Sequence, residues 1–171
     1  MRDRSFEPPV SCAMKWSANE GRKDRFFGAT EVDEGRPLDA GWQKQTWGGL
    51  DILMSSVHEQ IAWSGYSAYT ASKAALGMLT KTLAQEAAAQ GVRVLAVGPG
   101  AIRTPINRTV WANPGTLKLL RQKIPLNRLG EPDEIARMVV VLVSDTASYI
   151  TGRTIFVDGG MTDYPSFIHG G

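Results

Sequence analysis

Cysteine is nearly absent from this chain of 171 residues, since Cys12 is the only one. A single thiol cannot form an intrachain disulfide or a multi-cysteine zinc site. Long hydrophobic runs are absent too: the longest aliphatic stretch covers residues 138–143, whereas a membrane-spanning helix needs about 20 apolar residues. No apolar signal segment follows the first residues. From these absences we expect a cytoplasmic protein without a membrane partner and without a metal site.

An excess of charge of one sign is also lacking. The chain has 19 Lys and Arg residues against 17 Asp and Glu residues, which gives a formal net charge of +2. Proteins that bind nucleic acids or anionic membranes concentrate positive charge, because they must displace counterions from phosphates. We therefore expect no nucleic-acid partner. With 43% apolar residues, the composition is that of an ordinary globular domain.

Aliphatic residues are scarce in the first part of the chain. Residues 1–50 contain four Val and Leu residues and no Ile, whereas residues 51–171 contain thirty Ile, Leu and Val residues. A buried parallel strand reads as a near-continuous aliphatic run. We therefore interpret residues 1–48 as an irregular leader, in which scattered Trp, Gly and Pro residues follow no helical or strand period.

Regular elements are predicted from Leu50 onward. Aliphatic runs bounded by turn residues predict strands at 50–54, 92–97 and 154–157. Residues 66–90 are rich in Ala, Leu, Lys, Gln and Glu, which predicts a long helix that ends at Gly91. Its core-facing side is expected to consist of Ala71, Ala75, Met78, Leu79 and Leu83.

Two shorter helices are predicted in the second half of the chain. One covers residues 116–123, within a segment at 101–124 that we interpret as a lid. The other opens at Pro132, has Asp133 and Glu134 in its first turn, and runs to Val143. Strands that alternate with helices predict an α/β fold with an open, mostly parallel sheet of the doubly wound, Rossmann-like kind.

The strongest candidate for a catalytic group is the combination of Ser56, Tyr69 and Lys73. Tyr69 and Lys73 are four residues apart in the predicted helix and so project from one face. A cation beside a phenol favours the phenolate, which makes the hydroxyl a usable general acid or base. Ser56 ends the preceding strand, at the edge where parallel sheets place ligand sites. In a chain of this composition, roughly 0.01 chance occurrences of a Ser, Tyr and Lys at this spacing are expected.

Other residues near the predicted site leave alternatives open. His58 and Glu59 could contact a polyol or form a solvated loop pair. Trp63 could line a substrate pocket or only pack the loop. Asp158 precedes two glycines, which favours a turn over a metal ligand, and no cluster of His, Cys and carboxylate residues supports a metal site. His169 lies between glycines in the tail, where we expect an exposed side chain.

Further sequence blocks follow the Ser56, Tyr69 and Lys73 triplet. They are VGPGAIRTP at 97–105, RLGEPDEIA at 128–136 and SYITG at 148–152. Together with the triplet, these blocks resemble the short-chain dehydrogenase/reductase family over about residues 48–171. Within that family, SSVHEQI at 55–61 and the tail at 158–167 are similar to bacterial glucose 1-dehydrogenases. The resemblance implies an oxidoreductase that uses NAD or NADP to oxidise an alcohol or a sugar such as glucose.

The resemblance also implies a role for each matched residue. Tyr69 would exchange the proton with the substrate oxygen, Ser56 would orient that oxygen, and Lys73 would favour the phenolate and contact the nicotinamide ribose. The nicotinamide side would be lined by Tyr69, Lys73, Pro99, Gly100, Ile102 and Thr104. The alternative for Thr104 is the start of a helix after a turn. The resemblance further implies a homo-oligomer built through helix 66–90 and the C-terminal strand.

The chain departs from the family in its first part. A dinucleotide-binding fold holds the pyrophosphate on a Gly-rich turn between its first strand and helix, and the family's Thr-Gly-x3-Gly-x-Gly pattern is missing here. The family's Asn-Asn-Ala-Gly strand end and its catalytic Asn are missing too. We therefore expect residues 49–171 to be the C-terminal half of such a domain, truncated and weakly active. The alternative is a non-catalytic remnant that serves as an oligomerisation module.

Overall fold

The computed structural model describes residues 49–163. The expected leader at 1–48 and His169 lie outside the described residues. One sheet of three parallel strands forms the centre, in the order β1 (Leu50–Met54), β2 (Arg93–Pro99) and β3 (Arg153–Val157). The predicted α/β fold with a parallel sheet is confirmed. The boundaries of β1 match the prediction, and those of β2 and β3 differ from it by one or two residues.

The register places the carboxyl ends of the strands at one edge. Strand β2 is central, with Met54 of β1 opposite Val97 and Val157 of β3 opposite Pro99. Residues 94–97 of β2 are completely buried, as expected for a parallel strand covered on both faces. Both loops that carry the candidate site residues, after β1 and after β2, therefore leave the sheet at the same edge.

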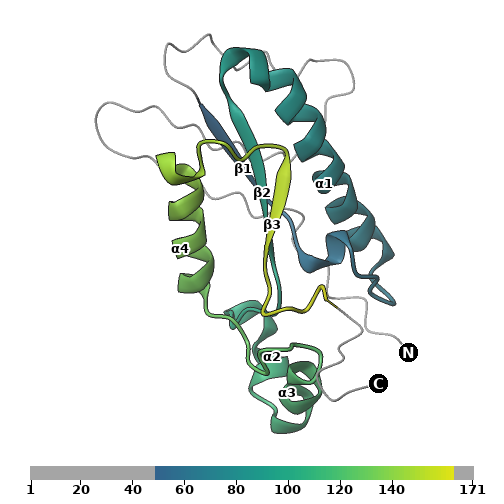
Figure 1. The fold of residues 1–171 in the computed structure, drawn as a ribbon. Helices are drawn as coiled ribbons and strands as arrows, with labels where there is room; N and C mark the ends of the chain where they lie inside the picture. Colours follow the sequence, from purple (N-terminus) through teal and green to yellow (C-terminus); the bar gives the residue numbers. More distant parts are fainter. Residues whose placement is uncertain (1–48, 164–171) are drawn as a thin grey trace.

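Helices cover both faces of the sheet. Helix α1 (Ser67–Ala87) lies on one face and helix α4 (Pro132–Val143) on the other (Figure 1). Because successive side chains of a strand point to opposite faces, β2 serves both layers: Val94 packs with Leu83 under α1, whereas Leu95 packs with Leu142 of α4. Short 3-10 helices follow α1 and α4, η3 (Ala88–Gln90) and η5 (Asp145–Ala147).

The predicted core-facing side of α1 is largely wrong. Ala71, Ala75 and Met78 are exposed, with Met78 at 61%. The buried positions of the helix are Lys73, Gly77, Thr80, Leu83, Ala84 and Ala87. Three of these residues are Gly or Ala, whose small size lets the helix lie close to the sheet. The two polar ones have partners, because Lys73 donates to the Met54 carbonyl and Thr80 to the Leu76 carbonyl.

Gly91 ends the helical segment as predicted. Its φ of 70° is left-handed, and its N–H donates to the Ala88 carbonyl. Glycine adopts this conformation without the steric cost that a side chain brings.

A helical segment connects β2 to α4 at the carboxyl edge of the sheet. It consists of η4 (Pro105–Asn107), α2 (Arg108–Trp111) and α3 (Pro114–Arg121), which lie beyond the ends of β2 and β3 (Figure 1). Helix α3 starts at Pro114, two residues before the prediction, because the Asn113 side chain accepts from the N–H groups of Gly115 and Thr116. The Leu126 N–H donates to the Gly159 carbonyl and anchors the segment to the turn after β3.

Candidate active site

Ser56 is fixed at the carboxyl end of β1. The strand continues into a short 3-10 helix, η2 (Val57–Glu59), and Ser56 is its N-cap. The Ser56 hydroxyl accepts a hydrogen bond of 3.2 Å from the backbone N–H of His58. The residue is buried, and the neighbouring Ser55 N–H donates to the Val97 carbonyl of β2. Ser56 therefore lies on a loop that is tied to both the sheet and η2.

Tyr69 and Lys73 lie in the first two turns of α1. The Lys73 side chain is buried and its Nζ donates to the Met54 carbonyl at 2.9 Å. The same nitrogen lies 5.7 Å from the centre of the Tyr69 ring. A buried ammonium needs polar partners, because desolvation of a charge is costly. The Met54 carbonyl thus holds the cation between the end of β1, two residues before Ser56, and the Tyr69 ring.

An aromatic cluster surrounds Tyr69 on the same side. The rings of His58 and Trp63 stack at 4.5 Å, and those of Trp63 and Tyr66 stack at 4.0 Å. Tyr69 meets the cluster edge to face, 6.0 Å from His58 and 6.2 Å from Trp63. Trp63 remains 45% exposed, so it packs the loop and also presents apolar surface. The sequence interpretation missed Tyr66, whose only signal was its position next to the helix start.

Glu59 is not part of the solvated loop pair considered from the sequence. Its carboxylate accepts hydrogen bonds from the Ser55 hydroxyl at 2.7 Å and from the Thr154 hydroxyl of β3 at 3.0 Å. The side chain lies against Gly77 of α1. Glu59 is therefore half-buried and bound to the protein, rather than solvated. Its distant partner Thr154, 95 residues away, carried no local signal in the sequence.

Packing explains part of the loop after β2. Gly100 donates its N–H to the Val157 carbonyl, and a Cβ at this position would lie 2.7 Å from the Asp158 Cα. Thr104 is the N-cap of η4, and its N–H donates to the Asn107 side chain. The helix-start interpretation of Thr104 is therefore confirmed. Pro99 ends β2.

The backbone N–H of Ile102 is a feature of this loop that suits a ligand. Ile102 forms an isolated bridge with Gly130, in which Arg103 N and Ala101 O make the hydrogen bonds. Among the described residues, no acceptor receives the backbone N–H of Ile102 itself. This donor, at the carboxyl edge of the sheet, is suited to a carbonyl or carboxamide oxygen.

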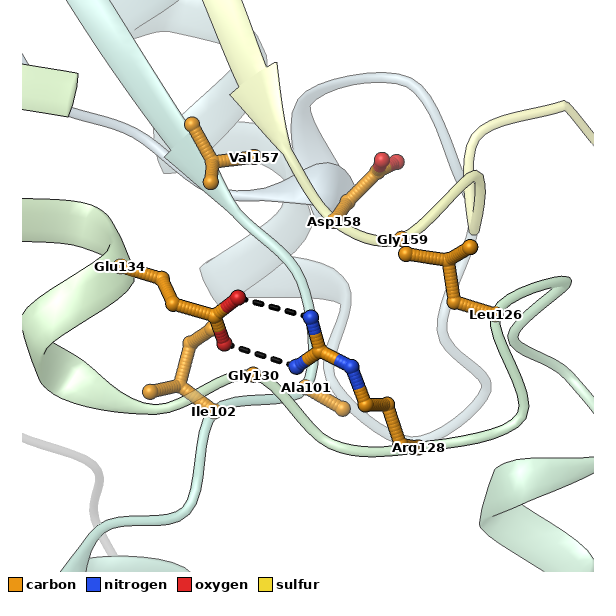
Figure 2. Close-up of a pocket in the computed structure, with 9 residues that line it drawn as sticks. All are labelled: Ala101, Ile102, Leu126, Arg128, Gly130, Glu134, Val157, Asp158 and Gly159. Atoms are coloured by element: carbon orange, nitrogen blue, oxygen red, sulfur yellow. Dashed lines mark hydrogen bonds and ion pairs between the residues drawn. The ribbon is translucent and has the colours of Figure 1, made fainter.

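A small cavity lies beside Ile102, between the loops after β2 and β3 (Figure 2). Its volume is about 120 Å³, smaller than the several hundred Å³ typical of small-molecule sites, and it includes none of Ser56, Tyr69 and Lys73. Arg128 and Glu134 line it and form two parallel hydrogen bonds of 2.8 and 2.7 Å. The hydrogen bond from Arg128 is the main reason that the pKa of Glu134 falls from 4.5 to about 2. The charged groups of Arg128 and Glu134 in the cavity are therefore already hydrogen-bonded to each other.

Asp158 has the role of a turn residue. Its carboxylate accepts from the N–H groups of Gly160 and Thr162 and from the Thr162 hydroxyl. Within residues 49–163, no three His, Cys, Asp or Glu side chains gather to form a metal site. In the same part of the chain, no helix is both long and apolar enough to span a membrane.

The geometry supports proton transfer at the carboxyl edge of the sheet. The Lys73 ammonium lies at the end of β1, two residues before Ser56, and 5.7 Å from the centre of the Tyr69 ring. Among the described residues, no hydrogen bond joins Ser56 to Tyr69. A phenol beside a fixed cation can give and take a proton. The Met54 carbonyl, which fixes the cation, could not be predicted, because a backbone group carries no residue-type signal.

Comparisons with known proteins show which proteins this chain is similar to. The family model described as enoyl-(acyl carrier protein) reductase matches residues 41–162. The chain is 51% identical, over 122 residues, to a 3beta-hydroxysteroid dehydrogenase 1 from Eggerthella lenta, covering 71% of this chain and 47% of that protein. It is 44% identical, over 126 residues, to a glucose 1-dehydrogenase from Gluconobacter oxydans, covering 74% of this chain and 47% of that protein.

Solved structures of dehydrogenases also match this chain. A 4-hydroxyisoleucine dehydrogenase mutant in complex with NADH and succinate matches with a TM-score of 0.68 and 34% identity, over 70% of this chain and 49% of that chain. The chain thus spans about half the length of the curated relatives and solved structures that it matches.

Proposed function

This chain belongs to the short-chain dehydrogenase/reductase family, and we propose that it is an NAD(P)-dependent oxidoreductase acting on a CH–OH group. The observation that carries the proposal is the buried Lys73 ammonium, held by the Met54 carbonyl 5.7 Å from the Tyr69 ring. A charge is costly to bury, so a lysine in this position needs a reason beyond packing. Stabilising a phenolate on Tyr69 is such a reason.

In the proposed reaction, each residue of the triplet has a separate task. The Ser56 hydroxyl orients the substrate oxygen toward Tyr69. In the oxidative direction the Tyr69 phenolate accepts the hydroxyl proton of the substrate, and Lys73 stabilises that phenolate. When bound, NAD or NADP supplies the hydride acceptor for the substrate carbon. Tyr69 gives the proton back in the reductive direction.

The cofactor would be held by the residues that follow β2 and by α1. The Ile102 N–H has no acceptor among the described residues, so it can meet the nicotinamide carboxamide. Lys73 and Tyr69 would face the ribose. The neighbouring contacts would come from Pro99, Gly100 and Thr104. We propose NAD or NADP without a choice between them, because these residues would face the nicotinamide end of the cofactor, whereas the two cofactors differ at the adenosine ribose.

For the substrate, we propose an alcohol, with a sugar such as glucose as the first compound to test. Two relatives bear the names glucose 1-dehydrogenase and 3beta-hydroxysteroid dehydrogenase. The exposed Trp63 ring next to Tyr69 supports a substrate with an apolar face, and both compound classes have one.

We also propose that this chain alone turns over slowly. Its sequence has no Thr-Gly-x3-Gly-x-Gly pattern to hold a pyrophosphate. Positioning of reactants contributes on the order of 7 to 11 kcal/mol to well-oriented reactions. A few hydrogen bonds from Lys73, Ile102 and Thr104, at roughly 0.5 to 1.5 kcal/mol each, would replace only part of that contribution.

Calorimetric titration of the chain with NAD and with NADP tests the proposal directly. Weak binding of at least one cofactor is expected, together with slow glucose-dependent formation of NADH or NADPH that Tyr69→Phe abolishes. Tyr66→Phe is the matched control, because it removes a neighbouring phenol outside the proposed triplet. Turnover that survives Tyr69→Phe would contradict the assignment of the general base, and no binding of either cofactor would contradict the enzyme proposal itself.

A second candidate function is that of a non-catalytic oligomerisation module. It is favoured by the exposed side of α1, where Ala71, Ala75 and Met78 form an uncharged stripe. The same surface, together with β3, would join copies of an active enzyme. The cofactor titration separates the two functions, because a module without catalysis associates and binds neither NAD nor NADP.

A further inference from the structure

Glu59 links three elements beneath the proposed site. It belongs to η2, and its carboxylate accepts from the Ser55 hydroxyl at the end of β1. Both carboxylate oxygens also lie within 3.1 Å of the Thr154 hydroxyl of β3. The half-buried carboxylate of Glu59 thus has two hydroxyl donors. Removing the carboxylate would destabilise the fold, because it would leave both hydroxyls without their acceptor.

Helix α1 is shaped to admit this carboxylate. Gly77 is buried directly over Glu59, and a Cβ at position 77 would overlap the Glu59 carboxyl group. Glycine is unfavourable in a helix interior, and this one lies a single turn after Lys73. The close approach of Glu59 gives a physical reason for a glycine at this place.

The residues that Glu59 holds are next to the proposed catalytic groups. Ser55 precedes Ser56, and its hydroxyl also lies 3.5 Å from the Lys73 carbonyl. His58 precedes Glu59, and its ring stacks on Trp63 and meets the edge of Tyr69. Fixing Glu59 therefore fixes both ends of the short loop that carries Ser56 and His58.

We propose that Glu59 is a positioning residue: it pins the loop of Ser56 and His58 to α1 and β3, and Gly77 leaves the space for it. The role of these contacts in catalysis rests on the proposed function. The positioning of the loop by Glu59 does not depend on it. Glu59 acts through the loop, because its carboxylate accepts hydrogen bonds from the hydroxyls of Ser55 and Thr154.

Proton NMR of the full chain reads the loop position without any turnover. The chain has two histidines, so His169→Gln assigns the ring signals of His58. Protons over the face of an aromatic ring are shifted upfield, and stacking on Trp63 should shift those of His58 in this direction. We expect Glu59→Ala to lose this shift and Glu59→Gln to keep most of it, since an amide oxygen still accepts from both hydroxyls.

Glu86→Ala is the matched control, because Glu86 is an exposed glutamate of α1, and it should leave the His58 signals unchanged. An unchanged His58 shift in Glu59→Ala would overturn the proposal. Should Glu59→Ala fail to fold by circular dichroism, Thr154→Val takes its place. Thr154→Val removes one donor, so a partial loss of the shift is expected and no loss would overturn the proposal.

A double-mutant cycle tests the role of Gly77. Gly77→Ala alone must displace the carboxylate, so it should cause the same loss of the His58 shift as Glu59→Ala. In the Glu59→Ala background the added methyl group meets an empty space, so Gly77→Ala should leave the His58 shift unchanged and should raise the denaturant midpoint, because alanine is favoured over glycine inside a helix. Additive effects would overturn the proposal. None of these measurements needs a cofactor, so a wild-type chain without cofactor binding would contradict the proposed function alone.

Discussion

Lys73 is the residue at which folding and the proposed chemistry compete. Its ammonium is buried and depends on the Met54 carbonyl and its other contacts, and burial of a charge opposes folding. Selection for stability alone would favour an apolar side chain of similar length, since such replacements are often neutral or stabilising. In the proposed function, the cation at this place serves its neighbour Tyr69.

This argument leads to a first prediction about Lys73. Lys73→Met should keep the free energy of unfolding within about 1 kcal/mol of the wild type, because the apolar chain fills the space and no charge is buried. Lys73→Ala should be less stable than Lys73→Met by roughly 2 kcal/mol, because it leaves a cavity. Urea denaturation followed by circular dichroism measures both values. A Lys73→Met chain as unstable as Lys73→Ala would show that the ammonium itself stabilises the fold.

A second prediction concerns the two glycines at the end of β2. A Cβ at Gly100 would lie 2.7 Å from the Asp158 backbone, whereas one at Gly98 would meet the edge of the Phe156 ring. The Phe156 ring can rotate away from an added methyl group, whereas the hydrogen-bonded backbone at Asp158 cannot. Gly100→Ala should therefore lower the free energy of unfolding by roughly 1 to 3 kcal/mol, which is more than the loss expected for Gly98→Ala. Thermal unfolding of both variants gives the comparison. An equal loss of stability in the two variants would mean that the turn after β3 moves as easily as the Phe156 ring.

For single residues, the sequence indicated which residues are candidates for the site better than it indicated their contacts. Tyr69, Lys73 and Ser56 were identified from spacing, because four residues in a helix and the end of a strand are local geometry. The partners of Glu59 and Lys73 were not, since Thr154 is distant in sequence and the Met54 carbonyl is backbone. The Ile102 N–H was indicated by resemblance, and its missing acceptor is visible only in three dimensions.

Among the elements, the start of α4 shows how a helix end is fixed by charge. Glu134 accepts from the N–H of Glu131 before the helix and pairs with Arg128, which comes from the preceding segment. Negative groups are favoured in the first turn, where backbone N–H groups are unpaired. The pair thus ties the segment between the candidate lid and α4 to the first turn of α4.

The shifted pKa of Glu134 gives a third prediction. Its value in the folded chain is about 2, below the ordinary 4.5, mainly through the hydrogen bond from Arg128. A lowered pKa means that the group contributes stability that is fully present above pH 4.5 and is lost as the pH falls toward 2. The stability difference between wild type and Glu134→Gln should therefore shrink over this range. A difference independent of pH between 5 and 2, measured by urea titration, would contradict the ion pair.

Element boundaries and element faces were unequally predictable. Strong local signals set the boundaries, such as Gly91 after α1 and Pro132 at the start of α4. The buried face of α1 was not found from apolar periodicity. Its buried side combines small residues with Lys73 and Thr80, whereas Met78 is exposed. A helix that must lie close to a sheet, and that carries catalytic groups, follows demands other than hydrophobicity.

For the whole molecule, apolar surface is left on the outer sides of both helices that cover the sheet. Met78 of α1 is 61% exposed and Val140 of α4 is 63% exposed. The inner sides of the same helices form the two hydrophobic clusters of the core. Exposed apolar side chains on a regular helix face are a common feature of interfaces, which is why association is the expected behaviour of this chain.

The fourth prediction is that self-association depends on the outer stripe of α1. Met78→Lys adds a charge to a side chain that is 61% exposed, so the monomer should fold as before. In an interface between copies, the same charge would lose its water without gaining a partner, which is costly. Sedimentation velocity should therefore show a shift of Met78→Lys toward the monomer, while Gln60→Lys, with the same charge on an exposed loop residue, keeps the wild-type distribution. Wild type and Met78→Lys with identical sedimentation would place the contact elsewhere, and the matched variant Val140→Lys would then test α4.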